Sequence, residues 1–96
     1  MGKGPGAIYK DCLARARSED KLLSKFEDDD IQKEINVRTG HCSMFEKDIR
    51  LMFFKQNYSE RTTDKALKQW CELDLTQPYQ YKYYKVYLFL ETSTKI

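Results

Sequence analysis

The stretch PYQYKYYKVYLFL, residues 78–90, holds most of the seven tyrosines of the chain and decides how the rest is interpreted. Apolar and aromatic side chains occupy most of its positions, so the segment has no clearly polar side in either a helix or a strand. Contiguous apolar surface of this kind usually marks a contact with a partner. Tyr suits such a contact, because its ring supplies area and its hydroxyl tolerates water at the rim. The chain is therefore predicted to be a subunit of a larger assembly.

Two secondary structures compete for this stretch. A strand suits its β-branched and aromatic content, but both faces would be apolar, and no equally convincing second strand is evident to satisfy its backbone. A helix has Thr76 or Gln77 ahead of Pro78, which is favoured at the first helical position. It also gathers one stripe of large side chains, namely Tyr79, Tyr83, Val86, Tyr87 and Leu90. The helix is the preferred interpretation.

The helical interpretation divides this segment into two sides, because successive residues turn by about 100°. The stripe is expected to pack on the helices of the chain itself. The remaining side is predicted to meet another chain, and the expected interface residues are Tyr81, Tyr84, Leu88 and Phe89.

Helical spacing also runs through the first half of the chain. Ile8, Cys12 and Ala16 share one side of a helix that is expected to begin near Ala7. Residues 18–21 are expected to cap a turn that leads into Leu22, Leu23 and Phe26. The acidic run of residues 27–30 then suits a helix start, with Ile31, Ile35 and Val37 on the apolar side and Gly40 as the stop.

Two more amphipathic helices are predicted around a break at residues 56–59. Ser43 and Glu46 fit a capping box for the first of them, and Thr62 or Thr63 is expected to cap the second, which ends near Asp74. The first apolar face holds Phe45, Ile49, Met52 and Phe53, and the second holds Ala66, Leu67, Trp70 and Cys71. The expected core anchors are Phe45, Ile49, Phe53, Leu67 and Trp70.

These patterns predict an all-α fold of four or five short amphipathic helices. A flexible leader is expected over residues 1–6 and a single domain over residues 7–96. A chain of 96 residues buries a limited share of its surface, so a partner is expected to supply part of its stability.

Composition argues against several classes of function. Lys and Arg (17) nearly balance Asp and Glu (15), which does not favour a nucleic-acid partner. Three widely spaced cysteines favour free thiols over a disulfide framework. No apolar run approaches the length of a membrane span.

No motif points to catalysis, a cofactor or a metal. His41 lies beside Cys42, but no Cys-x-x-Cys pair completes a zinc site, so both are interpreted as ordinary side chains of a loop. Six cations in the second half could meet phosphate but are interpreted as polar sides of the two helices. They are Lys47, Arg50, Lys55, Arg61, Lys65 and Lys68.

From Glu27 onward, several landmarks resemble the small matrix-side helical subunit of mitochondrial ubiquinol–cytochrome c reductase, the subunit-seven or ubiquinone-binding-protein family. The acidic run of residues 27–30, the segment from Phe45 to Arg50, the pair Gln69-Trp70 and the aromatic end from Tyr84 to Glu91 carry the likeness. The Arg-Leu-Pro that follows the first helix in that family is replaced by Arg38-Thr39-Gly40, and the Leu-Pro before its Trp segment is missing.

A second likeness is to LYR-motif accessory proteins, through Ile8-Tyr9-Lys10 and the later residues 54–57. Both resemblances imply a non-catalytic accessory or assembly subunit of a mitochondrial complex, most simply respiratory complex III. It would lie peripherally on the matrix side of the inner membrane, bind other subunits rather than nucleic acid, and need no cofactor. The alternative from a different class is a small α+β nucleic-acid-binding module, in which the tyrosine-rich stretch is a strand.

Overall fold

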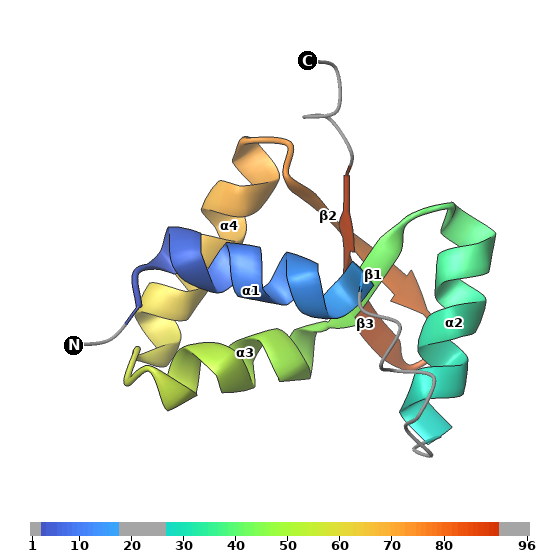
Figure 1. Cartoon of the computed structure of the whole chain (residues 1–96), viewed down its shortest axis with the longest axis horizontal. Helices are drawn as coiled ribbons and strands as arrows, with labels where there is room; N and C mark the ends of the chain where they lie inside the picture. Colours follow the sequence, from blue (N-terminus) through green and yellow to red (C-terminus); the bar gives the residue numbers. More distant parts are fainter. Residues whose placement is uncertain (1–2, 18–26, 91–96) are drawn as a thin grey trace.

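The computed structural model describes residues 3–17 and 27–90, which fold into helices and strands (Figure 1). The helices are α1 (Pro5–Arg17), α2 (Glu27–Thr39), α3 (Glu46–Lys55) and α4 (Glu60–Glu72). The strands are β1 (Cys42–Phe45), β2 (Thr76–Tyr81) and β3 (Tyr84–Phe89). The prediction of an all-α fold is therefore wrong, because the described chain is an α+β domain.

The strands form one antiparallel sheet in the order β1-β3-β2. β2 and β3 make a hairpin, in which Tyr81 pairs with Tyr84 across a two-residue turn. β1 pairs with the other edge of β3 and places Phe45 opposite Val86. The tyrosine-rich stretch thus finds one strand partner within itself and the other more than thirty residues upstream.

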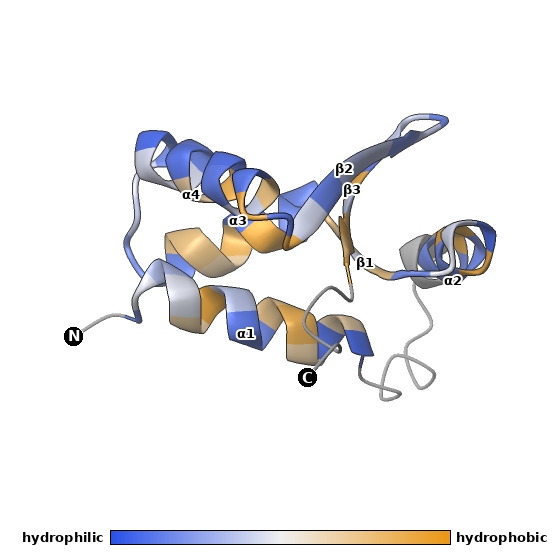
Figure 2. Ribbon diagram, turned by 90° about the horizontal axis from the view of Figure 1, so that it is seen from above, coloured by the Kyte–Doolittle hydropathy of each residue, from blue (hydrophilic) through white to orange (hydrophobic). Residues whose placement is uncertain are grey.

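Helices cover both faces of this sheet. Figure 2 shows α2 on one side of β1 and β3, with α1, α3 and α4 on the other. Side chains alternate along β3, so Tyr87 and Phe89 face the three helices while Val86 and Leu88 face α2. A central strand buried on both faces is apolar on both faces. This arrangement explains the composition that the sequence analysis assigned to a two-sided helix.

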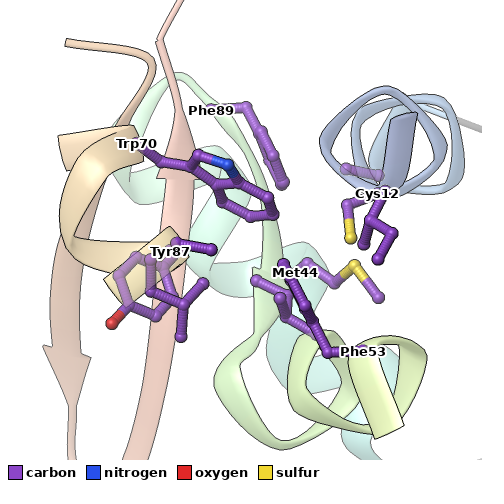
Figure 3. Close-up of a cluster of buried hydrophobic side chains, with 11 residues drawn as sticks. Cys12, Met44, Phe53, Trp70, Tyr87 and Phe89 are labelled. Carbon is purple, nitrogen blue, oxygen red and sulfur yellow. The ribbon is translucent and has the colours of Figure 1, made fainter. Parts of the chain in front are cut away.

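Two clusters of buried side chains result. The first core lies between the sheet and the three helices, and it comprises Ile8, Cys12, Ala16, Met44, Ile49, Phe53, Ala66, Leu67, Trp70, Tyr87 and Phe89. Figure 3 shows the labelled members pointing into one cluster from α1, β1, α3, α4 and β3. The second core lies between the sheet and α2, and it comprises Ile35, Phe45, Tyr81, Val86 and Leu88.

The residues expected to contact a partner through one helical side lie within these two cores. Tyr81 and Leu88 are buried in the second core and Phe89 in the first, while Tyr84 is half-buried against the second. The physical reason is the period of two along a strand, which sends neighbouring residues to opposite faces. The helical side that grouped these four residues does not exist.

Ser43 belongs to a strand rather than to a helix cap. Its hydroxyl donates to the side-chain oxygen of Asn36 at 2.6 Å, and its carbonyl accepts a hydrogen bond from the side-chain amide of Gln32. These contacts tie β1 to α2. Helix α3 begins at Glu46, after Phe45, with no side-chain cap. The predicted capping box at Ser43 and Glu46 is therefore wrong.

Other expectations for the first half hold. Ile8, Cys12 and Ala16 are buried on one side of α1, as their spacing predicts. Gly40, at φ 75°, ends α2, and its N–H donates to the carbonyl of Asn36. Val37, by contrast, is 85% exposed and does not belong to the apolar side. The predicted cap and turn over residues 18–26 lie outside the described residues.

The start of the chain departs slightly from expectation. Helix α1 begins at Pro5, ahead of the expected start near Ala7. The N–H of Lys3 donates to the side-chain oxygen of Gln56 at 2.9 Å, and its carbonyl accepts from the hydroxyl of Tyr58 at 2.6 Å. Lys3 is thereby attached to the segment that joins α3 to α4.

Cys12 should resist alkylation while the protein is folded. Its Sγ lies 3.6 Å from the sulfur of Met52, and burial raises the pKa of the thiol from 9.0 to about 12. Since the thiolate is the nucleophile, iodoacetamide at mildly alkaline pH should label the half-buried Cys42 and Cys71 first. Peptide mass mapping over time measures the order. In urea, all three should react at similar rates.

The same pKa shift has a defined sign for stability. A pKa that is raised on folding stabilises the fold fully below the unfolded value of 9.0. The contribution of Cys12 is lost as the pH rises from there toward the folded value. Labelling of native Cys12 as fast as that of Cys71 would contradict the buried position.

Candidate nucleic-acid interface

Helices α3 and α4 are joined by a tight turn, residues 56–59. Asn57 adopts φ 67°, a left-handed conformation that Asn tolerates better than most residues. The amides of Asn57 and Tyr58 donate to the carbonyls of Phe54 and Phe53 at 2.9 and 3.1 Å. Figure 1 shows α4 running steeply across the direction of α3. Two helices crossing after a turn of this length form a helix-turn-helix.

The second helix of this motif has a defined start. The hydroxyl of Ser59 accepts from the N–H of Thr62 at 3.1 Å, which is an N-cap hydrogen bond. The hydroxyl of Thr63 donates to the carbonyl of Ser59 at 2.8 Å and is buried. The expected caps Thr62 and Thr63 are therefore wrong, and the helix begins one turn earlier.

Helix α4 has sharply different sides. Thr63, Ala66, Leu67 and Trp70 face the first core and are buried. Arg61, Lys65 and Lys68 follow the spacing i, i+4 and i+7 on the opposite side, and all three are exposed. We call these three residues the basic stripe. None of them forms an ion pair with another residue in the described part of the chain.

Acidic residues on α4 reduce this charge less than their number suggests. Asp64 is paired with Arg50 of α3, whose Nη2 lies 2.7 Å from its carboxylate. Arg50 also donates to Glu46 at 3.0 Å, and Glu46 lies 3.7 Å from the Nζ of Lys85 on β3. Glu72 lies on the same side as the basic stripe, one turn beyond Lys68. Glu60 is also exposed, in the first turn of α4, so the three acidic residues of the helix equal the basic stripe in number. The positive charge of α4 is therefore a property of the side that carries the basic stripe and not of the helix as a whole.

The Arg50 network also fixes α4 on α3. Burial disfavours the charge of Arg50, but the hydrogen bonds to Asp64 and Glu46 outweigh this and raise its pKa. Arg50 therefore stays charged under all ordinary conditions. Its ion pairs link both helices of the helix-turn-helix and, through Glu46, the central strand. They set the orientation in which the basic stripe is presented.

The hairpin adds more positive charge. The segment from Thr76 to Phe89 contains no acidic residue, and its two cations, Lys82 and Lys85, are exposed. Tyr83, in the turn, is 97% exposed. Figure 2 shows α4 and the tip of the hairpin along the same side of the molecule, both in hydrophilic colours. Of the two hairpin cations, Lys85 shares the α4 face of the sheet and lies 3.7 Å from Glu46, whereas the Nζ of Lys82 lies over the ring of Tyr81 on the α2 face.

The six cations noted in the sequence do not act as one set. Arg61, Lys65 and Lys68 form the basic stripe. Arg50 is engaged in ion pairs, and the Nζ of Lys47 lies 5.7 Å from the ring centre of Phe45. Lys55 lines a shallow pocket between α1 and α3.

The five expected core anchors are all buried, in different places. Ile49, Phe53, Leu67 and Trp70 lie in the first core. Phe45 lies in the second core, because it is the last residue of β1 and points to α2. The prediction that Phe45 shares an apolar face with Ile49 assumed that both belong to one helix.

Other kinds of site have little support in the described chain. Among residues 3–17 and 27–90, no group of three or more His, Cys, Asp or Glu side chains could hold a metal ion. No helix in the same ranges is long and apolar enough to cross a bilayer. Cys42 is half-buried in β1 opposite Phe89, and His41 precedes the strand.

Sequence reasoning missed both parts of the interface. The break at residues 56–59 between two amphipathic patterns was the available signal for the helix-turn-helix. The spacing of the basic stripe was the second signal. The hairpin gave only a weak one, because its turn is Lys82-Tyr83 rather than the Asn-Gly that favours such turns.

Comparisons of the chain with protein-family models, with curated proteins and with solved structures give no match.

Proposed function

We propose that this chain binds double-stranded DNA, with the exposed side of α4 in the major groove. The observation that carries the proposal is the basic stripe on the second helix of a helix-turn-helix. In such motifs the second helix enters the major groove and its N-terminal residues reach base edges. Arg61 and Lys65 lie in that half of α4.

The dimensions agree with this role. A helix of 13 residues is about 20 Å long, and the major groove of B-DNA, about 12 Å wide, admits a helix. The major groove of double-stranded RNA is too deep and narrow for the same insertion. DNA is therefore the better ligand for α4.

The hairpin supports the same binding mode. Lys85 lies two residues before Tyr87 on β3, so it lies on the face of the sheet that α4 covers. The Nζ of Lys82 instead lies over the ring of Tyr81, on the α2 face. Exposed lysines of this kind suit phosphates, which fix the orientation of the protein on the duplex but do not specify sequence. The overall charge of +2 is uninformative here, because DNA responds to the charge of one side.

Salt dependence tests the proposal directly. Fluorescence anisotropy with a labelled duplex of random sequence should show binding that weakens linearly in log salt. Four phosphate contacts, three from the basic stripe and one from Lys85 of the hairpin, correspond to a slope of about −3 to −4. No binding at low salt, or binding that salt does not change, would contradict the proposal.

The role of an accessory subunit in a mitochondrial complex remains a prediction. It rests on the sequence resemblances, and the aromatic helix expected to carry the contact is replaced by the β2–β3 hairpin. Its localisation and its partner subunits are likewise predictions. Co-purification with respiratory-chain proteins from mitochondria is the measurement that would support it.

A further inference from the structure

The tip of the hairpin carries residues that a turn does not favour. Lys82 adopts φ 55°, a conformation better suited to Gly or Asn. Tyr83 follows it with 97% of its surface exposed. No aromatic ring in the described part of the chain packs against Tyr83. Residues that oppose local conformational preference are common at functional sites.

Two cations lie close to this tip. The guanidinium carbon of Arg38, from α2, and the Nζ of Lys82 each lie 5.2 Å from the ring centre of Tyr81. The two charges are therefore at most twice that distance apart. Glu34 is the acidic group nearby, and it accepts a hydrogen bond from the hydroxyl of Tyr81. The positive charges exceed the negative charge around the tip.

We propose that Tyr83, Lys82 and Arg38 form a second subsite, which holds an unpaired base and its phosphate beside the duplex. The inference rests on the proposed function and extends it to a class of DNA. A tyrosine ring on a convex tip has free faces that can stack on a base. Bases inside a duplex have both faces covered by their neighbours, so an unpaired base beyond the duplex offers Tyr83 the most accessible face.

The distance across the molecule matches the reach that a duplex on α4 would need to bring its end to Tyr83. The longest extent of the described chain is 33 Å, which is about one helical turn of B-DNA. Figure 2 shows the tip at the far end of the molecule from α4, on the same side. A duplex seated on α4 that ends in an overhang can therefore bring its first unpaired base to Tyr83. Lys82 precedes Tyr83 in the turn, and Arg38 lies over the ring of Tyr81, so both cations can attract the phosphate of that nucleotide.

The test compares one duplex in several forms, measured by anisotropy and by 2-aminopurine fluorescence. The forms are a blunt duplex, duplexes with a short 3′ or 5′ overhang carrying 2-aminopurine, and duplexes with abasic overhangs of the same length. The native protein should bind one of the two duplexes with a 2-aminopurine overhang about tenfold more tightly than the blunt duplex. Binding should also quench the fluorescence of the 2-aminopurine. The abasic overhang has the same phosphates and should give little gain.

Variants at the tip decide whether Tyr83 is responsible. Tyr83→Ala should remove the tenfold gain and the quenching, whereas Tyr83→Phe should keep both because its ring still stacks. Neither should change thermal unfolding, since the side chain is exposed. A gain that persists in Tyr83→Ala, or that is absent in the native protein, would overturn the inference.

The two proposals fail in different ways. If the blunt duplex binds with a steep salt dependence but bases in the overhang add nothing, the subsite is refuted and the role of α4 stands. If the overhang binds through Tyr83 but the blunt duplex does not bind, the role of α4 is refuted and the subsite stands.

Discussion

Replacing Arg61, Lys65 and Lys68 together with Gln should weaken binding of a blunt DNA duplex roughly 10²- to 10³-fold at about 0.1 M salt. Each change removes a cation from the exposed side of α4, and one lost contact to a phosphate or base edge costs about 1 kcal/mol or more. The slope of log affinity against log salt should also become less steep, by about 3. Anisotropy titrations at several salt concentrations measure both effects.

A second triple variant matches this change in charge. Lys10→Gln, Arg17→Gln and Lys33→Gln remove one Arg and two Lys from exposed positions on α1 and α2. We expect it to change the affinity less than about threefold, because these residues lie outside the basic stripe and act only through long-range charge. Both variants should unfold at the temperature of the native protein. Equal weakening in both would mean that net charge, and not α4, determines binding.

The helices of the domain were largely predictable because each carries its own apolar period. Ile8 and Cys12 in α1, and Leu67 and Trp70 in α4, repeat at helical spacing and are buried. Caps were less predictable. A Ser followed by a Glu three residues later fits a capping box at Ser43, but the backbone there pairs with β3. Tertiary pairing overrides a local signal of about 1 kcal/mol.

The sheet was hidden because its strands lack the usual pattern. β1 has four residues, which is too short to show a period. β2 contains Pro78 and two further exposed residues, Gln77 and Gln80, as suits an edge strand. It therefore looks unlike a partner for an apolar segment. β3 alone is strongly apolar, and a strand covered on both faces cannot be told from a buried helix by periodicity. Choosing a strand over a helix for this segment required knowing that α2 covers the second face of the sheet.

The charge of the candidate site could not be predicted from the sequence alone either. The cations of α4 were identified in the sequence, but their acidic neighbours on the same helix, Glu60, Asp64 and Glu72, appeared to cancel them. Only the structure shows that Arg50, from another helix, neutralises Asp64. The charge of a surface depends on which side chains the fold brings next to it. A net charge near zero for the whole chain therefore does not exclude a nucleic-acid partner.

Trp70→Ala should lower the free energy of unfolding by about 3–5 kcal/mol. The indole is 3% exposed, and its ring centre lies 5.2 Å from that of Tyr9 on α1 and 5.6 Å from that of Phe53 on α3. Figure 3 shows it beside Tyr87 and Phe89 of the central strand. Trp70 therefore joins three helices and the sheet, and its removal leaves a cavity where these elements meet.

Urea titration followed by circular dichroism measures this loss, because Trp70 is the only tryptophan and its own fluorescence disappears with it. Leu73→Ala is the matched control, since Leu73 follows α4 but is 58% exposed and should change stability by no more than about 0.5 kcal/mol. A domain of this size has about 5–15 kcal/mol in total, so Trp70→Ala should remove a large fraction of its stability and lower the urea midpoint markedly. Trp70→Phe should retain most of the affinity for duplex DNA despite reduced stability, because the ring faces the core and not the groove. An unchanged urea midpoint in Trp70→Ala would contradict the packing of α4 on the first core, and with it the orientation of the basic stripe.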